Sequence, residues 1–560
     1  MPAIAGMIHS QPEDMRLAEA MSELLAHRAP QSGSVLWFNG NLTPRLQTSP
    51  LPSTAPVMAE VALVQRPAAS LESATDPRQR YWVSFDGALY NADALRAELH
   101  VEGNDAQLAI AAWDAWGGEC FNRLNGAWAM AIYDREKRAL ILSRDRFGIR
   151  PLYYWVNRNK LVFASEIKAL FALPDIRPRM ERQVMADFLH HGTPDLGTQN
   201  FYSHITALPA AHYAVLPLDA PLPVKPVRYW QVSSEPAHLG DDAAASRFGE
   251  LLRDAVALRA GRATGPIGAG FTGGVASAAV AATLRRHLPA DILLNSFTAH
   301  FPPEQDERTW LTLLNSVAHS LTNSVNPLPE EMMVDLDTLL WHQEMPFAHP
   351  ATYTEWCVLR TAFEAQVPTL LTATGADEMF GIAPPAETAR RGWLNRNTPE
   401  RALERLMPET LANPPAAASL TPPLQSEDRN SAAFAISTHA PLLDHRLVEL
   451  IATLSPTQRT NLATLRRAFR DTLPEPLLNR EGHGSYSAPL QSWMQTTILP
   501  AFMQDIKQAR LPLVPAIDGG ALRELVTRQL ARPDAALTPL LFRLFIANRW
   551  MLRFHVAPLV

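Results

Sequence analysis

Apolar and polar residues alternate along the second half of the chain in a way that predicts strands followed by helices. Residues 245–260, "ASRFGELLRDAVALRA", place apolar side chains at helical spacing. Residues 265–274, "GPIGAGFTGG", predict a strand that ends in a glycine turn, and the small-residue run 275–288 predicts a helix after it. The segments 291–301, "DILLNSFTAHF", and 367–381, "VPTLLTATGADEMFG", predict further strands that end in polar turns. Strands that alternate with helices indicate a doubly wound parallel sheet, whose ligands lie beyond the carboxyl ends of the strands.

The first half of the chain has a different pattern, in which strands predominate. Residues 81–99, "YWVSFDGALYNADALRAEL", predict an extended segment, a turn at Asp86-Gly87 and then a helix. Residues 126–148, "GAWAMAIYDREKRALILSRDRFG", predict two alternating strands joined by a charged turn. We therefore expect a β-rich half with a few helices, and an α/β class for the chain as a whole.

Two proline-rich stretches divide the chain. The first has four prolines between Leu216 and Val232, which remove backbone donors and hold the chain extended. It predicts three parts, namely a domain at 1–215, a linker at 216–240 and a domain at 241–560. A chain of 560 residues exceeds what one hydrophobic core usually supports, which agrees with this division. The second stretch, 407–430, is rich in proline and alanine and predicts a mobile excursion or lid.

Composition and charge narrow the function classes. Hydrophobic residues make up 47% and charged residues 19% of the chain, which is typical of a globular protein. The formal net charge of -6 gives no reason to expect nucleic acid or a membrane as a partner. Cys120 and Cys357 lie too far apart to indicate a disulfide framework or a cysteine metal site. The first residues lack the basic region of a signal peptide, and no long apolar run follows, so we expect a cytoplasmic protein.

The glycine turn after the strand at 265–271 is a candidate phosphate site. A turn between a strand and a helix leaves backbone N–H groups at the helix N-terminus, where an anion can bind. Gly273 and Gly274 let the backbone approach a phosphate, and the hydroxyls of Thr272 and Ser277 can donate to its oxygens. Taken alone, the pattern also fits a plain turn whose small residues allow the helix to pack closely on the sheet.

Longer motifs, in one order along nearly the whole chain, resemble those of the asparagine synthetase family of ATP-dependent amide-forming enzymes. The most specific are "RDRFGIRPLYYW" at 144–155, similar to that family's "RDRFGIKPLYY", and "FASEIKALFALP" at 163–174, similar to its "FASEIKALL". The turn "TGGVAS" at 272–277 resembles the family's pyrophosphate-binding loop "SGGxDS". The segments "LNGAWAMAIYD", "TATGADEMFG" and "APLLDHRLVEL" also have counterparts there.

The resemblance implies two domains and two reactions. The N-terminal domain would be a glutaminase of the N-terminal-nucleophile type, an α+β sandwich in which a cysteine at position 2 releases ammonia from glutamine. The C-terminal domain would be a doubly wound ATP pyrophosphatase, or adenylating, domain. With ATP and Mg²⁺ it would adenylate a carboxylate, and an amine would then displace AMP.

Residues that the resemblance requires for the glutaminase reaction are altered. Pro2 stands at the position of the nucleophilic cysteine, and a proline has no thiol. The family's "HRGPD" reads "HRAPQ" at 27–31. Its "NGE" reads Asp86-Gly87-Ala88, so a carboxylate faces the place where an amide would stabilise an oxyanion. We therefore expect domain 1–215 to be an inactive glutaminase domain that is kept as a scaffold.

A relative without glutaminase chemistry needs another amine. Among similar proteins, β-lactam synthetases and lasso-peptide cyclases close rings with an amine of the substrate itself, and a held amine has a high effective molarity. The loss of the cysteine and the start "AIAGM" look most like the cyclases. The predicted reaction is formation of a macrolactam, in which the N-terminal amine of a precursor peptide attacks an adenylated Asp or Glu side chain. The predicted partners are that peptide, as in antibiotic biosynthesis, and a leader-peptide protease.

The resemblance also assigns the adenylating site. The predicted ATP and pyrophosphate site consists of Thr272, Gly273, Gly274, Ser277, Phe297 and Gly375. Asp377 in "TGADEMFG" matches the aspartate that binds magnesium bridging the ATP phosphates. Thr374 stands where asparagine synthetases carry a glutamate, which argues against free aspartate as the substrate.

Two departures from the family pattern leave the activity open. Ala276 replaces the aspartate of "SGGxDS", so one of two expected metal carboxylates is missing. Residues 477–493, "LLNREGHGSYSAPLQSW", lack the family lysine, and Arg480 or His483 is predicted to supply its positive charge. Three accounts remain, namely an active cyclase with a rearranged metal shell, an inactive scaffold or binding member whose loop has decayed, and a deliberate Asp-to-Ala change that traps a complex.

Overall fold

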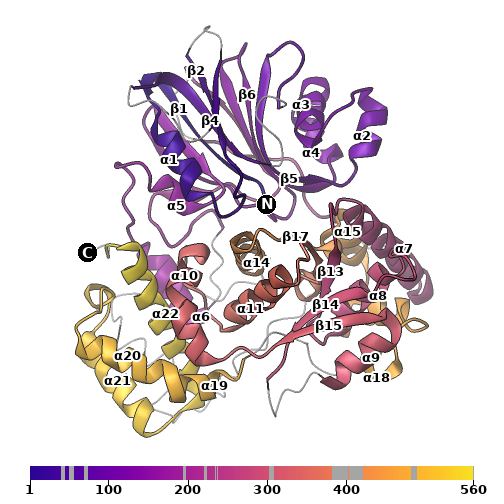
Figure 1. The fold of residues 1–560 in the computed structure, drawn as a ribbon, viewed down its shortest axis with the longest axis vertical. Coiled ribbons are helices and arrows are strands. Elements are labelled where there is room, and N and C mark those ends of the chain that lie inside the picture. The colour runs from indigo at the N-terminus through magenta and orange to yellow at the C-terminus, as the bar shows by residue number, and fades with distance from the viewer. Residues whose placement is uncertain are drawn as a thin grey trace.

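The computed structural model describes two halves of the chain, one built on two antiparallel sheets and one on a parallel sheet (Figure 1). The described residues are 1–558 without 40–43, 49–55, 68–73, 193–196, 220–223, 234, 236–237, 302–307, 381–401, 403–405, 407–419 and 481–487. Among the helices of these residues, none combines the length and the apolar character that crossing a bilayer requires.

The first half is a sandwich of two antiparallel sheets. The larger has the order β10 (Ile205–Ala207), β8 (Tyr153–Asn157), β9 (Lys160–Ala164), β1 (Ala3–Asp14), β4 (Met58–Arg66), β2 (Ser34–Phe38) and β3 (Arg45–Thr48). The smaller has the order β12 (Val227–Arg228), β11 (His212–Pro217), β7 (Ala139–Arg144), β6 (Gly126–Asp134) and β5 (Tyr81–Leu89). Alternation along β1 sends Ile4 and Ile8 into the core shared by the sheets and Ala5 and Met7 to the opposite face.

Helices flank the sandwich on both sides (Figure 1). They are α1 (Leu17–Leu24) beside the larger sheet, α2 (Ala92–Leu99), α3 (Asp105–Trp116) and α4 (Cys120–Arg123) beside the smaller one, and α5 (Ile167–Leu170) further along the chain. The next helix, α6 (Arg182–His191), packs instead against α22 (Thr538–Phe554) of the second half. Met21 and Leu25 join the core on the outer face of the larger sheet, and Leu108 and Ile110 join the core of the smaller one. The layers form the α+β sandwich that the sequence resemblance implies.

The predicted strand pair at 126–148 is confirmed by β6 and β7, but the turn predicted at Asp86-Gly87 is wrong. β5 continues to Leu89, with Gly87 paired to Trp128 of β6. Gly87 has a φ of 143°, and a Cβ at this position would lie 1.9 Å from the Ala127 carbonyl oxygen. The glycine therefore serves the close approach of two strands, and the chain turns only after the strand ends.

The second half is a doubly wound parallel sheet, as predicted. Its order is β15 (Ser320–Val325), β14 (Leu294–Ala299), β13 (Ile267–Gly270), β16 (Thr369–Leu371) and β17 (Ser437–His439). The chain starts in the centre at β13, extends the sheet to one side and then returns to extend it to the other. This reversal creates a switch point at the carboxyl end of β13, where α/β sheets bind their ligands.

The helices of the second half cover both faces of the parallel sheet, and the last of them form a group of their own beside it (Figure 1). They are α7 (Asp241–Ala260), α8 (Val275–Arg285), α9 (Arg308–Ala318), α10 (Pro329–Gln343), α11 (Ala351–Glu364), α12 (Ala376–Phe380), α14 (Thr421–Ala433), α15 (His445–Thr453), α16 (Pro456–Arg459), α17 (Ala463–Ala468), α18 (Glu475–Leu478), α19 (Leu490–Trp493), α20 (Leu499–Lys507), α21 (Gly519–Ala531) and α22 (Thr538–Phe554). Neighbouring residues of β16 join different cores, Leu371 the one with α7 and α8, and Leu370 the one with α11.

The lid predicted at 407–430 is partly wrong. Residues 407–419 lie outside the described part of the chain, but residues 421–430 belong to α14. The helix tolerates its prolines because they occupy the first turn, where a missing N–H removes no intrahelical hydrogen bond. Its buried residues include Glu427, Asp428 and Arg429, so the second part of this stretch is a packed helix.

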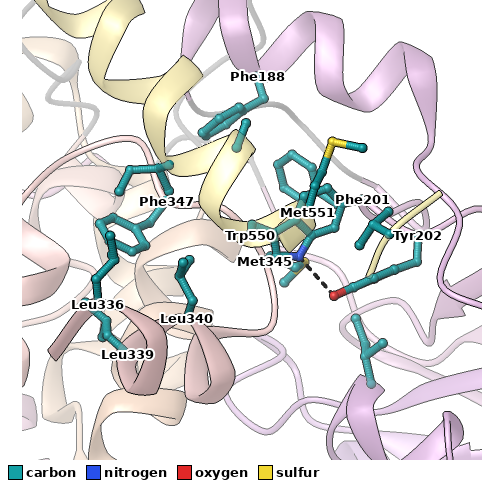
Figure 2. Close-up of a cluster of buried hydrophobic side chains, with 14 of the residues drawn as sticks. Phe188, Phe201, Tyr202, Leu336, Leu339, Leu340, Met345, Phe347, Trp550 and Met551 are labelled. Atoms are coloured by element: carbon teal, nitrogen blue, oxygen red, sulfur yellow. Dashed lines mark hydrogen bonds between the residues drawn. The ribbon is translucent and has the colours of Figure 1, made fainter. Parts of the chain in front are cut away.

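Aromatic packing joins the end of the first half to the C-terminal helices (Figure 2). Trp550 of α22 packs against Tyr202, with ring centroids 5.1 Å apart. The Trp550 indole donates to the Tyr202 hydroxyl at 2.9 Å, and that hydroxyl donates to the Glu344 carbonyl at 2.6 Å. Because Tyr202 follows α6 whereas Glu344 follows α10, this cluster fixes segments far apart in sequence.

Candidate active site

Two turns lie side by side at the carboxyl edge of the parallel sheet. Ala269 of β13 pairs with Leu371 of β16 in a parallel register, so the turns that follow, 271–274 and 372–375, leave the sheet at neighbouring points. β17 adjoins β16, and the Thr372 amide donates to the His439 carbonyl at 3.0 Å. The candidate site is the edge formed by these three strand ends, which we call the strand-end site.

The glycine turn has the predicted geometry of strand, turn and helix. β13 ends at Gly270, Gly273 has a φ of 79°, and α8 begins at Val275. The Ser277 hydroxyl donates to the Gly274 carbonyl at 2.9 Å and lies 3.3 Å from the Thr272 hydroxyl. These hydroxyls hold the turn beside the first-turn N–H groups of an eleven-residue helix, where an anion is stabilised by the helix end.

Arg480 reaches the same turn from the C-terminal region. Its guanidinium donates to the Gly273 carbonyl at 2.6 Å and lies over the ring of Trp310, 4.5 Å from the centroid. A guanidinium stays protonated at all physiological pH values, so it brings a permanent positive charge to the glycine turn. His483, the other predicted cation, lies outside the described residues.

Of the remaining predicted residues, Gly375 and Asp377 lie at the second turn and Phe297 lies in the core. Gly375 has a φ of 90°, and a Cβ there would lie 2.4 Å from Leu443 Cδ2, so the second turn requires glycine. It leads into α12, where Asp377 is exposed in the first turn. Phe297 is fully buried, and only its backbone faces the glycine turn, because its carbonyl accepts from the Phe271 amide at 2.8 Å.

The donor set fits a phosphate better than a magnesium ion held by the protein. Ala276 lies in the first turn of α8, is 8% exposed and packs in the core of the sheet, so it offers no oxygen ligand. Within the described residues no group of three His, Cys, Asp or Glu side chains could hold a metal ion. Asp377 would offer one carboxylate, so a Mg²⁺ ion there would take its other oxygens from phosphates and water. We therefore assign no reaction step to a metal ion held by this chain.

A carboxylate that the sequence did not single out reaches the strand-end site from α14. Glu427 accepts a hydrogen bond from the Thr372 hydroxyl at 3.0 Å and a very short one from the Thr374 hydroxyl, both on the turn after β16. Burial raises the pKa of Glu427, although hydroxyl donors, including Thr438 of β17, lower it in part. A carboxylate with a raised pKa is suited to accept a proton near neutral pH.

A second carboxylate lies close to Glu427. Glu355 of α11 accepts from Asn430 at 2.8 Å and from Ser426 at 3.1 Å, both on α14. Burial, and next the negative charge of Glu427, raise the pKa of Glu355 to about 8. At neutral pH the two carboxyl groups therefore share fewer than two negative charges, because neighbouring carboxylates resist joint ionisation.

Glu427 compensates in space for what Thr374 lacks in sequence. The resemblance places a glutamate at position 374, and here the threonine hydroxyl at that position holds the carboxylate of Glu427 instead. The two residues are 53 positions apart, so no local motif could connect them. The one available signal was the missing carboxylate itself, which implied either a loss of function or a replacement from elsewhere.

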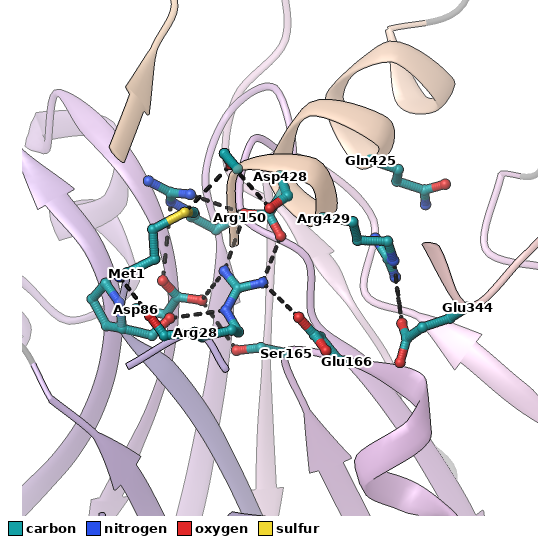
Figure 3. A network of polar contacts seen from close by, with 12 residues as sticks. Met1, Arg28, Asp86, Arg150, Ser165, Glu166, Glu344, Gln425, Asp428 and Arg429 are labelled. Atoms are coloured by element: carbon teal, nitrogen blue, oxygen red, sulfur yellow. Dashed lines mark hydrogen bonds and ion pairs between the residues drawn. The ribbon is translucent and has the colours of Figure 1, made fainter. Parts of the chain in front are cut away.

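The region around Pro2 holds ion pairs and no thiol (Figure 3). The Arg28 side chain donates to the Pro2 carbonyl at 3.1 Å, and the Met1 amino group donates to the Arg28 carbonyl at 2.7 Å. Asp86, at the place of the family amide, accepts from Ser165 at 3.1 Å and pairs with Arg28 at 3.4 Å. Cys120, the cysteine of this half, is buried in the sandwich core, where burial raises the pKa of its thiol far above neutral pH.

These ion pairs continue across the junction of the two halves. We call the set the interdomain ion cluster, and its members are Arg28, Asp86, Arg150, Glu166, Lys168, Glu344, Asp428 and Arg429, all at most 6% exposed. Four cations and four carboxylates balance formally. Burial alone would lower the pKa of Arg28, but Asp428, Asp86 and Glu166 raise it well above its ordinary value. The charged form of Arg28 is therefore stable inside the cluster.

Family models match both halves of the chain. A model described as Glutamine amidotransferase domain matches residues 1–230, and one described as Asparagine synthase matches residues 247–421 and 416–552. Asparagine synthetase [glutamine-hydrolyzing] 3 of Bacillus subtilis is 24% identical, over 74% of this chain and 78% of its own length.

Other relatives match over a smaller part. Asparagine synthetase [glutamine-hydrolyzing] 1 of Bacillus subtilis is 26% identical over 54% of this chain and 48% of its own length. A putative asparagine synthetase of Methanocaldococcus jannaschii is 24% identical over 53% of this chain and 58% of its own length. The chain thus spans about half the length of these two relatives.

Proposed function

Because this chain belongs to the asparagine synthase family, we propose that its C-terminal half forms an amide bond at the expense of ATP and that the bond closes a macrolactam ring in a precursor peptide. The observation that carries the proposal is the filled region around Pro2. Where a glutaminase would expose a thiol, Arg28, Asp86 and their partners form buried ion pairs. In this proposal the nitrogen comes from an amine of the substrate, as in the lasso-peptide cyclases that the sequence resembles.

The proposed reaction has two balanced steps. An Asp or Glu carboxylate of the peptide attacks the α-phosphorus of ATP, which forms an acyl adenylate and releases pyrophosphate. The peptide's N-terminal amine then attacks the acyl carbon, which forms the amide, releases AMP and frees one proton. The product is lighter than the peptide by one water, and the ring closes because a folded peptide holds its amine near the acyl carbon.

Residues of the strand-end site suit both steps. The first turn of α8 and the Thr272 hydroxyl would bind the β- and γ-phosphates, and Arg480 would offset negative charge that develops as pyrophosphate leaves. Glu427 would accept the proton that the attacking amine loses. Asp377, exposed at the start of α12, would contact a cation that the phosphates carry.

Mass spectrometry tests this proposal. The protein, ATP and Mg²⁺ are incubated with leader-cleaved peptides that carry an Asp or Glu a few residues from a free N-terminus. We expect a product lighter by one water, together with AMP and pyrophosphate in equal amounts. Peptides acetylated at the N-terminus serve as the control and should give no such product. No product and no pyrophosphate from any peptide would overturn the proposal. A leader-peptide protease is the partner that would supply the free amine.

One observation favours a second function, that of a binding or scaffold subunit. Ala276 is packed in the core of the sheet, and no metal cluster exists among the described side chains. Such a subunit would bind ATP weakly and without dependence on Mg²⁺. Isothermal calorimetry with and without Mg²⁺ separates the two functions, because tight binding that requires Mg²⁺ excludes the scaffold.

A further inference from the structure

Two consecutive residues of α14 face the two halves of the molecule. Glu427 contacts Thr372 and Thr374 at the strand ends, whereas Asp428 contacts Arg28 of the first half. Consecutive residues of an α-helix point about 100° apart around its axis. The rotation of α14 about its axis therefore couples the two contacts, and fixing Asp428 fixes the direction of Glu427.

Arg28 holds Asp428 with a two-point contact. Its Nη1 donates to Asp428 Oδ2 at 2.7 Å and its Nη2 to Oδ1 at 3.1 Å, while Arg150 Nη1 donates to Oδ1 at 2.9 Å. Parallel bonds from a planar guanidinium define an orientation as well as a distance. Arg28 and Asp428 are 0% and 3% exposed, so salt does not screen the contact.

Small errors in helix rotation would disturb the strand-end site. A carboxylate lies about 5 to 6 Å from the axis of its helix, so a rotation of about 20° moves it by about 2 Å. A displacement of about 1 Å can lower the rate of a positioned reaction about 100-fold. The hydrogen bonds of Glu427 to Thr372 and Thr374 would not survive such a shift, because they are direct contacts.

We propose that Arg28 is a positioning residue for Glu427, acting across the junction through Asp428 on α14. The N-terminal half thus contributes to amide formation, because it fixes the proton acceptor of the other half. The ion pairs around Pro2 then have a role in the reaction. This inference rests on the proposed function for its catalytic consequence. The positioning itself is a property of the protein without substrate.

Titration of the Glu427 carboxyl by infrared spectroscopy tests the positioning directly. The band is assigned by its loss in Glu427→Gln, and Glu355 and Arg150, whose charges also act on this carboxyl, are kept in every other variant. Arg28→Lys keeps the charge but loses the two-point contact, so we expect weaker Thr372 and Thr374 bonds and a midpoint raised by about one pH unit. Asp428→Asn removes a negative charge, which by charge alone would lower the midpoint, whereas loss of positioning raises it. The direction in which the midpoint shifts therefore distinguishes the change in charge from the loss of positioning.

Arg262→Met is the matched control, because Arg262 pairs with Asp105 across the junction at 2.6 Å and α14 takes no part in that pair. It should leave the Glu427 midpoint unchanged. An unchanged midpoint in Arg28→Lys, or a lowered one in Asp428→Asn, would overturn the positioning. In the peptide assay, Arg28→Lys should slow amide formation about tenfold and shift its acidic limb upward, with ATP–pyrophosphate exchange within about threefold. A parent enzyme that makes no amide would refute the proposed function, and the titration would still decide the role of Arg28.

Discussion

In the interdomain ion cluster each buried carboxylate lies against a guanidinium or an ammonium group, whereas Glu427 at the strand ends lies against hydroxyl groups. Asp428 has Arg28 and Arg150, and Glu344 has Arg429. Glu427 forms no salt bridge with any described residue, and its bonds come from Thr372, Thr374 and Thr438. Charges that balance each other stabilise a junction, while a buried carboxylate without a counterion remains able to exchange a proton.

From this comparison we infer that the interdomain ion cluster stabilises the structure and that the strand-end site carries out the chemistry. Arg28, in the region around Pro2, contacts Asp428 of α14. The strand-end site keeps the turn, the helix end and a carboxylate, even though Ala276 and Thr374 lack the family's side chains. We therefore expect the loss of family residues to have different consequences in the two regions. Around Pro2 it accompanies a structural contact, and at the strand ends it accompanies a site that still holds a carboxylate.

The largest expected effect is on amide formation in Glu427→Gln. The glutamine keeps hydrogen bonds with the threonine hydroxyls but accepts no proton, so we expect amide formation to fall about 100-fold or more. ATP–pyrophosphate exchange should change little, because adenylation needs no proton acceptor. Glu449→Gln is the control, since Glu449 accepts from Trp230 at 2.9 Å, away from the strand ends. Equal loss of both activities in Glu427→Gln would place this residue in the fold and not in the chemistry.

Arg28→Met should have the largest effect on stability. Removing one partner of a buried ion pair leaves carboxylates without a counterion and costs about 3 to 5 kcal/mol. Asp377→Ala, at an exposed position of α12, should cost less than about 1 kcal/mol. Urea denaturation at neutral pH measures the free energy of unfolding of both variants. If Arg28→Met and Asp377→Ala lowered the free energy of unfolding by similar amounts, the distinction between a structural junction and a functional strand edge would be contradicted.

Ala276→Asp should have a smaller effect, on the affinity for magnesium-ATP. An aspartate in the first turn of α8 would restore the missing carboxylate of the loop, and a negative charge is favourable at a helix N-terminus. We expect about tenfold tighter binding that depends on Mg²⁺, together with faster pyrophosphate release. Ala276→Asn should gain much less because it adds no charge. No gain in Ala276→Asp, with no loss in Asp377→Ala, would show that the turn no longer binds nucleotide.

Part of the fold followed from local sequence, and part did not. The run "GPIGAGFTGG" predicted β13 and its turn, because a buried parallel strand and a glycine turn are both local patterns. The lid at 407–430 failed in its second part because a stretch rich in proline usually indicates a loop. Only the opposite charges of Arg28, Arg150 and Glu344, which come from distant segments, make Asp428 and Arg429 acceptable inside.

The candidate site shows the same limit. The strand, turn and helix around Thr272 to Gly274 followed from the local sequence, and of the two cations that the resemblance suggested the structure brings Arg480 to this turn. Glu427 could not, because it replaces the family glutamate through space from another element. The chemistry of a site depends on whether it contains a carboxylate, and not on which residue occupies one position of the sequence.

The last effect concerns pH at a contact between the halves. His439 of β17 lies 3.0 Å from the Tyr90 hydroxyl, and burial, with the charges of Arg150 and Arg259, lowers the pKa of His439 to about 3. The unfolded chain binds a proton near pH 6.5 and the folded chain does not. Stability from this group is therefore complete above pH 6.5 and is lost as the pH falls toward 3, by about 2 kcal/mol at pH 5.

Urea denaturation at pH 7.5 and pH 5 checks this expectation. His439→Gln, which does not titrate, should lose less stability than the parent between these values, by about 2 kcal/mol. His9→Gln, at a half-buried histidine of β1, is the control for the loss of a histidine elsewhere in the fold. Parallel losses in the parent and His439→Gln would remove His439 from the acid response.

The source of the nitrogen tests the central claim most directly. The protein is incubated with ATP, Mg²⁺, a peptide substrate and glutamine labelled with ¹⁵N in its side-chain amide, and the product is weighed by mass spectrometry. If the first half is structural and the second half joins the peptide's own amine and carboxylate, the product is unlabelled and lighter than the peptide by one water. A product that carries ¹⁵N, with glutamate formed alongside it, would show a working glutaminase and contradict the account.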